Sequence, residues 1–193
     1  AKDNDKVIAT IDSWPSEAKN PIGRVKEVLG QAGQHNTEMH AILAEFDLPL
    51  RFTEKVLAEA EKIPEVISKE EIKKRHDFRD TLTFTIDPAD AKDFDDAISY
   101  KKIGENRWEV GVHIADVTHY IKPGSVLDNE AFERATSVYL VDRVVPMLPE
   151  RLSNGVCSLR PNEDKLCYSV IFEMDAQANV LSYAIEKTII NSD

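Results

Sequence analysis

Aspartates crowd the run Thr85-Ile-Asp-Pro-Ala-Asp-Ala-Lys-Asp-Phe-Asp-Asp96, where four of them stand at offsets 0, +6, +8 and +9: Asp87, Asp93, Asp95 and Asp96. Carboxylates this close together repel one another unless positive charge lies between them. An alternating apolar pattern over residues 82–86 predicts a strand directly before the run. A loop that leaves a strand end can turn these oxygens toward one point, and hard oxygen ligands select Mg²⁺ or Mn²⁺ over zinc. The run therefore predicts a divalent-cation site.

Other interpretations of the acidic run were weighed. An EF-hand needs Gly at its sixth position and Glu at its twelfth, but counting from Asp93 these positions hold Ile98 and Gly104. An acidic turn that caps a helix or keeps a loop soluble is the plain alternative for two or three aspartates, and four favour a metal site. A calcium-binding structural domain is a weaker alternative. A cluster of this kind has room for two cations about 4 Å apart, as in phosphodiester hydrolysis.

Composition sets the limits of the chain. It has 193 residues, of which 42% are hydrophobic, enough to bury a core. No stretch approaches the roughly 20 apolar residues of a membrane helix, and the N-terminus has neither an initiator Met nor an apolar signal region. We expect a segment of a longer, soluble protein. Cys157 and Cys167 have no zinc-ligand spacing, which predicts buried thiols in a reducing compartment, by default the cytoplasm.

The charge balance argues against simple nucleic-acid binding. The chain has 35 acidic and 24 basic residues and a net charge of −11. A free-standing nucleic-acid binder normally carries a basic footprint. Either this chain binds no nucleic acid, or bound metal and further domains supply the positive field.

The first 80 residues predict a small β unit followed by short helices. Residues 7–14 alternate as a half-buried strand does, and residues 23–29 predict a second strand. Helical patterns follow behind a possible Asn36 cap, behind Thr53, and behind Ser68, whose partner Glu71 completes a capping-box signature. The charged face of residues 69–79 is expected to be solvated rather than in contact with RNA.

Strands dominate the pattern from residue 81. Residues 108–114 alternate after a turn at 104–106, and a final hairpin is predicted from strands at 168–174 and 180–190 that flank residues 175–179. A helix is predicted from Asp128 to about Val138, followed by an irregular Pro-rich stretch. The predicted fold class is mixed α+β.

Four segments in order carry a family resemblance. They are the acidic run to Ala97, Val112-His-Ile-Ala-Asp-Val-Thr-His-Tyr120, Pro146-Met-Leu-Pro-Glu-Arg-Leu-Ser153 and Cys157-Ser-Leu-Arg-Pro-Asn-Glu163. Together they resemble the start of the catalytic domain of the ribonuclease II and ribonuclease R family, and the form of the second segment is closer to the ribonuclease R branch. Upstream, Trp14-Pro-Ser-Glu-Ala-Lys-Asn-Pro-Ile-Gly-Arg-Val-Lys-Glu-Val-Leu-Gly30 resembles the closing strands of the second cold-shock domain of these proteins.

The resemblance implies a domain order. Residues 1–35 are expected to be the C-terminal part of a cold-shock domain, which is an oligonucleotide-binding β-barrel, and residues 36–80 a helical linker. Residues 81–193 are expected to be the N-terminal part of a ribonuclease II-type mixed α/β catalytic domain. The family's catalytic domain continues beyond this length and brings a later arginine and glutamate to the active site. An oligonucleotide-binding domain follows it. These remaining domains are expected partners within the parent chain.

The resemblance also implies a function. Members of the family are processive 3′-to-5′ exoribonucleases that hydrolyse single-stranded RNA to nucleoside 5′-monophosphates with Mg²⁺, and Mn²⁺ is a possible substitute. The family's four metal-site aspartates match Asp87, Asp93, Asp95 and Asp96, whereas Asp90 lies outside that set and is assigned a solvent or capping role. The alternative is a catalytically silent segment that binds RNA weakly or holds metal as a structural part.

Further residues were weighed for the site. Tyr139 matches the aromatic residue that the family stacks on terminal bases, and stacking contributes roughly 1–3 kcal/mol per base. Its alternative is a helix-end Tyr packed in the core. Arg160 is a candidate phosphate contact or the partner of Glu163 or Asp164. His113 and His119 are expected to have hydrogen-bonded structural roles rather than metal ligation.

Overall fold

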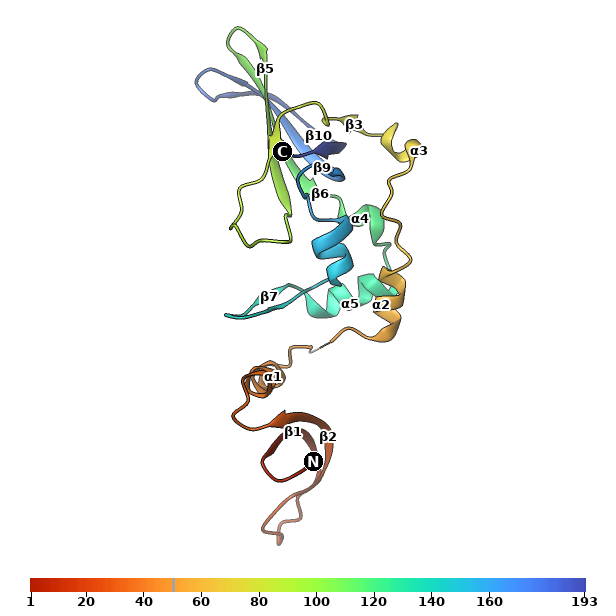
Figure 1. Cartoon of the computed structure of the whole chain (residues 1–193), viewed down its shortest axis with the longest axis vertical. Helices are drawn as coiled ribbons and strands as arrows, with labels where there is room; N and C mark the ends of the chain where they lie inside the picture. The colour runs from red at the N-terminus through yellow and green to blue at the C-terminus, as the bar shows by residue number, and fades with distance from the viewer. Residues whose placement is uncertain (50) are drawn as a thin grey trace. The chain divides into compact units, whose positions relative to one another are not determined.

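The computed structural model describes residues 1–49 and 51–193. Its contacts divide the chain into two compact units, each built from two segments. Ala1–Phe52 and Val138–Val145 form the first unit, and Thr53–Ser137 and Pro146–Asp193 form the second. Runs of strands and runs of helices follow one another along the chain (Figure 1), so the predicted mixed α+β class is confirmed. The predicted domain boundaries at residues 35 and 80 stay a prediction. None of the helices in the described part of the chain has the length and apolar character needed to cross a bilayer.

The first unit contains a long hairpin, one helix and a short hairpin. Its elements are β1 (Asp5–Ser13), β2 (Ile22–Gln31), α1 (His35–Glu45), β7 (Val138–Tyr139) and β8 (Val144–Val145). The strands predicted at 7–14 and 23–29 are therefore confirmed. β1 and β2 pair antiparallel with three register shifts along their length. Gly30 adopts φ +129°, a backbone conformation that favours glycine, where the chain turns from β2 toward α1. A side chain would also be too close to Thr37, because a Cβ on Gly30 would lie 2.5 Å from Thr37 Oγ1.

Two expectations for the helices need correction. Asn36 does not cap α1: the N-cap is Gln34, which makes no side-chain cap bond, and Asn36 lies inside the helix, where it accepts a hydrogen bond from Arg143. The helix predicted at 128–138 is α5 (Val126–Arg134). It begins earlier because the Ser125 hydroxyl accepts from the Asp128 N–H, and it ends earlier because Ala135 adopts φ +62°.

The second unit contains the remaining helices. Thr53 caps α2 (Glu54–Ala60) and Ser68 caps α3 (Lys69–Ile72), as predicted. The unit also holds α4 (Val117–Tyr120) and η1, an irregular helical segment over Arg151–Val156. The helix predicted beyond Ser68 is only four residues long. Residues 73–75 then form a turn that leads to the short strand His76–Asp77 at the edge of the sheet.

A six-stranded sheet forms the core of the second unit (Figure 1). Its order is β3-β10-β9-β6-β5-β4, with β3 parallel to β10 and the other neighbours antiparallel. The bounds are β3 (His76–Asp77), β4 (Thr83–Phe84), β5 (Asp96–Gly104), β6 (Arg107–Ala115), β9 (Asp164–Asp175) and β10 (Val180–Asn191). The predicted strand 108–114 and the final hairpin are confirmed, whereas the strand predicted at 82–86 shortens to two residues.

A chain of polar side chains crosses the buried face of this sheet. His113 on β6 lies between Ser99 Oγ on β5, 2.8 Å from its Nε2, and Ser169 Oγ on β9, 2.7 Å from its Nδ1. Ser169 in turn contacts Thr188 Oγ1 on β10 at 2.6 Å. Gly111 makes room for the chain, since a Cβ there would stand 2.4 Å from Ser99 Oγ and 2.5 Å from His113 Nε2. The sheet is therefore held by side-chain as well as backbone hydrogen bonds.

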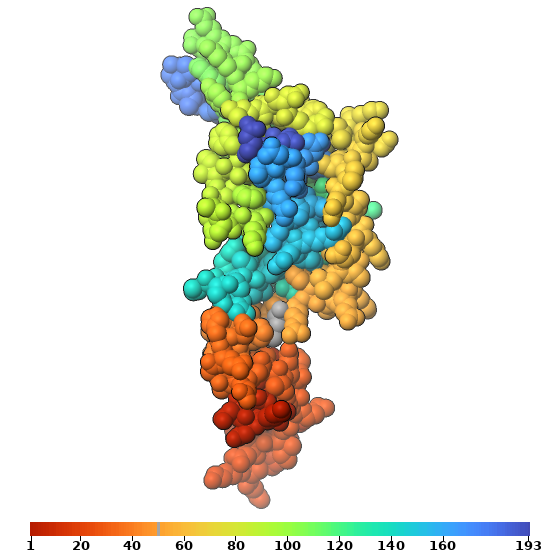
Figure 2. Space-filling model, in the orientation of Figure 1, coloured from red at the N-terminus to blue at the C-terminus, as the bar shows by residue number. Residues whose placement is uncertain are grey.

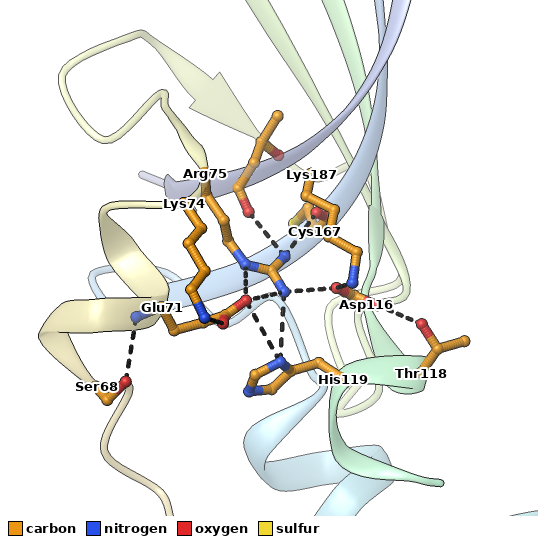
Figure 3. A network of polar contacts seen from close by, with 10 residues as sticks. Ser68, Glu71, Lys74, Arg75, Asp116, Thr118, His119, Cys167 and Lys187 are labelled. Atoms are coloured by element: carbon orange, nitrogen blue, oxygen red, sulfur yellow. Dashed lines mark hydrogen bonds and ion pairs between the residues drawn. The ribbon is translucent and has the colours of Figure 1, made fainter. Parts of the chain in front are cut away.

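Arg75 corrects the expectation of a solvated charged face at residues 69–79. Its side chain is fully buried, and its Nη2 lies 2.7 Å from Asp116 Oδ2, which is also buried (Figure 3). Its Nε donates to Glu71 at 2.8 Å and its Nη1 to the carbonyl oxygens of Cys167 at 3.1 Å and Thr188 at 3.4 Å. The turn after α3 places the guanidinium where it contacts Asp116, just after β6, and the backbones of β9 and β10.

Asp116 is the centre of this network. Burial by itself would raise the pKa of its carboxyl, but hydrogen bonds from Thr118 and Arg75 and the charges of Arg75 and Lys187 lower that pKa overall. The Thr118 hydroxyl lies 2.7 Å from Oδ1, and Lys187 Nζ lies 3.5 Å from Oδ2. Asp116 is therefore held as the charged partner of Arg75.

Arg75→Ala is expected to lower the free energy of unfolding by about 3–5 kcal/mol, because it leaves the Asp116 carboxylate buried without its partner. The matched control is Arg79→Ala, which removes an arginine from partly exposed pairs with Asp77 and Asp164 and is expected to cost less than about 1 kcal/mol. Urea unfolding of both variants measures the difference. Equal losses in the two variants would contradict a supporting role for the buried pair.

Candidate metal centre

The acidic loop, residues 85–95, connects β4 to β5 and reaches the surface of the second unit (Figures 1 and 2). Thr83 and Phe84 pair with Ser99 and Ile98, so the loop leaves and re-enters the same edge of the sheet. Asp96 is the first residue of β5 and pairs with Ile114. The prediction that the acidic run lies between strands is confirmed.

Backbone hydrogen bonds fix the second half of this loop. The Ala115 N–H donates to the Asp95 carbonyl at 3.0 Å, and the Leu159 N–H donates to the Phe94 carbonyl at 2.8 Å. The Ser158 hydroxyl accepts from the Phe94 N–H at 3.0 Å and donates to the Lys92 carbonyl at 2.8 Å. Three of the candidate ligands, Asp93, Asp95 and Asp96, therefore belong to an anchored stretch.

The first half of the loop is anchored less. Residues 86–90 are exposed, and the backbone bond described within this half joins the Ala91 N–H to the Pro88 carbonyl at 2.9 Å. Asp87 belongs to this half. Asp90 is exposed here too, which agrees with the solvent role assigned to it.

The four aspartates act on one another electrostatically. The pKa of Asp95 is raised, first by partial desolvation and then by the charges of three neighbouring carboxylates: Asp93, Asp96 and Asp87. The side chain remains open to solvent, so the desolvation is incomplete. No hydrogen bond or ion pair among the described residues joins a basic side chain to Asp87, Asp95 or Asp96. The structure thus concentrates negative charge at this loop.

The donor chemistry fits a hard divalent cation, because all four groups are carboxylates. Their positions, however, do not form a ligand set. In the part of the chain that the structure describes, no three His, Cys, Asp or Glu side chains are close enough to hold a metal ion. The carboxylates thus share one electrostatic field without forming a complete ligand sphere.

The histidines and cysteines take structural roles. His113 is fully buried, and desolvation lowers its pKa to about 4. His119 lies 3.5 Å from both Arg75 and Glu71, within the network around Asp116 (Figure 3). Both cysteines are buried free thiols, as predicted, and burial raises the pKa of Cys157 to about 12. A thiol with so high a pKa is a poor nucleophile at neutral pH.

Tyr139 and Arg160 are both accessible. Tyr139 lies on β7 and is 63% exposed, so the alternative of a helix-end tyrosine packed in the core is wrong. Arg160 Nη1 lies 3.9 Å from Glu163, whereas Asp164 is bound by Arg79. Their predicted contacts with RNA stay predictions.

Arg75, Asp116 and Ser158 were not among the predicted site residues. Asp116 and Ser158 stand inside the quoted motifs, but no local spacing signals their contacts, because Asp116 pairs with Arg75 41 positions away and Ser158 reaches a loop 64 positions away.

Comparison with protein-family models shows which known domains the chain matches. The model of the RNB domain matches residues 75–193, and that of a cold shock domain matches residues 1–53. The chain belongs to the ribonuclease II and ribonuclease R family. The predicted family is confirmed, and the acidic loop lies inside the part that matches the RNB domain.

Individual relatives agree with this family. The chain is 48% identical to ribonuclease R of Thermotoga maritima over 100% of its own length and 27% of the relative. It is 40% identical to the exosome complex exonuclease RRP44 of Mus musculus, over 97% of the chain and 20% of the relative. These relatives are named as a ribonuclease and an exonuclease, and the chain spans about a quarter of the length of the curated relatives it matches.

The fold agrees as well. The structure of Mycoplasma genitalium RNase R in complex with double-stranded RNA superposes with a TM-score of 0.91 at 31% identity, over 98% of this chain and 34% of that chain. The ribonuclease II and ribonuclease R fold thus extends over nearly all of the present chain.

His113 is expected to make stability pH-dependent. Its pKa is about 4 in the folded chain and about 6.5 when unfolded, so the unfolded state takes up the proton more readily. The neutral His113 ring makes its full contribution to the free energy of unfolding above about pH 6.5. This contribution, about 3 kcal/mol, is lost as the pH falls toward 4. Urea unfolding from pH 7 to 4 should show a steeper fall for the wild type than for His113→Gln. Parallel curves would show that His113 does not titrate as described.

Proposed function

We propose that the protein from which this chain comes is a Mg²⁺-dependent hydrolytic exoribonuclease that degrades single-stranded RNA from its 3′ end and releases nucleoside 5′-monophosphates. The observation that supports this most strongly is the shared field of Asp87, Asp93, Asp95 and Asp96 on one loop of the RNB-matching part. Such a concentration of carboxylates is suited to divalent cations.

The four aspartates would hold two Mg²⁺ ions, with Mn²⁺ as a possible substitute. Bound cations of this kind supply Lewis acidity and lower the pKa of water. The anchored stretch around Phe94 presents Asp93, Asp95 and Asp96, and Asp87 completes the set from the less anchored half of the loop. Among the described residues the ligand sphere is incomplete, so ion binding would draw these carboxylates closer together.

Other parts of the chain would contact RNA. Tyr139, exposed on β7, would stack on a base, and Arg160 would approach a phosphate. The cold-shock part would bind single-stranded RNA through its β unit. The net charge of −11 means that these contacts depend on the bound cations and on further domains of the parent chain for positive potential.

Asp95→Asn in the full-length parent is expected to lower kcat by roughly 100-fold or more, a barrier increase of about 3 kcal/mol, because it removes a cation ligand. Asp90→Asn is the matched control, since it removes a carboxylate from the same loop outside the proposed set, and its rate should stay near wild type. The assay follows 5′-labelled single-stranded RNA with Mg²⁺ and with EDTA. Full activity of Asp95→Asn would exclude its proposed role.

Tyr139→Ala in the full-length protein is expected to weaken single-stranded RNA binding by about 1–3 kcal/mol, the contribution of one stacked base. Tyr139→Phe keeps the ring and should bind nearly as the wild type does. Fluorescence anisotropy with a labelled oligonucleotide measures both affinities. If the two variants bind alike, whether strongly or weakly, stacking by this ring is not the source of the affinity.

A second candidate function is a catalytically silent segment that binds RNA or metal. The observation in its favour is that no group of three potential ligands is assembled among the described residues. Metal-dependent release of mononucleotides by the 193-residue chain itself would exclude this candidate. A preference for Ca²⁺ over Mg²⁺ in the full-length protein, without nuclease activity, would instead support the calcium-binding alternative.

A further inference from the structure

Ser158 is a buried side chain that contacts the acidic loop twice. The residue is 0% exposed, and its hydroxyl uses both of its hydrogen-bonding capacities on one short stretch of backbone. It accepts from the Phe94 N–H at 3.0 Å and donates to the Lys92 carbonyl at 2.8 Å. Of the natural small side chains, only a hydroxyl can donate and accept at one atom in this way.

The segment that carries Ser158 is itself fixed on several sides. The Ser158 N–H donates to Gly155, and the Leu159 N–H donates to the Phe94 carbonyl at 2.8 Å. The Leu159 carbonyl accepts from the Ser192 hydroxyl, just after β10, at 3.1 Å. The segment after η1 is therefore bonded to the residue that follows β10, and Ser158 bonds this fixed segment to the acidic loop.

Phe94 is held at both of its backbone groups, its N–H by Ser158 and its carbonyl by Leu159. It stands between Asp93 and Asp95, so the dihedral angles that set the separation of these two carboxylates cannot change freely without breaking one of these hydrogen bonds. Mutual repulsion among the aspartates acts to spread the loop. The two bonds of Ser158 oppose that spreading.

We infer that Ser158 is a positioning residue for the cation site, whose hydroxyl restrains the backbone between Asp93 and Asp95, two of the carboxylates that would bind a divalent ion. The inference rests on the proposed function. A loop that is already ordered loses less conformational entropy when the ion binds, which raises affinity without any new contact to the ion. Ser158 itself does not touch the cation or the RNA.

Ser158→Ala tests the inference against two other variants of the same chain. Ser99→Ala is the matched control, because it also removes a fully buried serine hydroxyl of the second unit but makes no described contact with the acidic loop. Asp95→Asn removes a proposed ligand. Ser158→Cys, kept under reducing conditions, preserves the side-chain volume with a weak donor and serves if the alanine variant does not fold. Thermal unfolding of each variant verifies that it is folded.

Two readouts are used. Water-proton relaxation gives the affinity for Mn²⁺, and amide hydrogen exchange followed by NMR gives the protection of the Phe94 N–H. In Ser158→Ala we expect Mn²⁺ affinity to fall roughly tenfold, because ion binding must then also order the loop, and Phe94 exchange to accelerate at least as much. Ser99→Ala should leave both readouts unchanged even though it lowers stability.

The outcomes distinguish the role of Ser158 from the proposed metal-dependent function. Loss of Mn²⁺ binding in Asp95→Asn, with unchanged binding in Ser158→Ala and Ser158→Cys, would overturn the role of Ser158 and leave the proposed function standing. Absence of saturable Mn²⁺ binding in the wild type would count against the proposed metal site in this chain and overturn the inference with it. Equal losses of affinity in Ser99→Ala and Ser158→Ala would also overturn it, because they would reflect general destabilisation.

Discussion

The buried pair of Arg75 and Asp116 is the interaction on which the second unit depends. A charged side chain withdrawn from water is tolerated only when its partners satisfy it, and here one guanidinium contacts two carboxylates and two backbone carbonyls. These contacts join the turn after α3 to the ends of β6, β9 and β10. The pair therefore fixes the strand ends closest to the acidic loop.

Few contacts separate the Arg75–Asp116 pair from the acidic loop. Asp116 follows Ala115, the last residue of β6, and the Ala115 N–H donates to the Asp95 carbonyl. On the other side, Ser158 and Leu159 hold Phe94. Asp95 is thus bounded by two anchors that both derive from the sheet. An electrostatically unfavourable cluster of carboxylates persists at the surface because the backbone beneath it is restrained, while the less anchored half that carries Asp87 leaves room for adjustment.

Local patterns were enough to predict much of the fold. The β9–β10 hairpin was predictable because alternation on both sides of a turn specifies a hairpin without any distant partner. The caps of α2 and α3 were predictable for a similar reason, since Thr53 and Ser68 bond within their own first turns. The predicted start of α5 at Asp128 was wrong because Ser125 caps the helix, which begins at Val126.

Long-range contacts set the limit of sequence-based prediction. Arg75 lies in a run of charged residues that is typical of a solvated surface, and only its pairing with Asp116 buries it. The acidic loop was predicted as a unit because its residues are adjacent, whereas the backbone bonds from Ala115 and Leu159 that hold its second half come from distant segments. Ser158 stood inside a recognised motif, but its contact with the loop follows from the folded path of the chain.

The most direct test of the cation site is the anomalous scattering of Mn²⁺ in crystals of this chain soaked with manganese. The account predicts one or two anomalous peaks at the acidic loop, each within about 2.0–2.6 Å of carboxylate oxygens, the range expected for hard divalent ions. The ligands should come from Asp87, Asp93, Asp95 and Asp96. Peaks confined to other carboxylates, with none at the loop, would contradict the account.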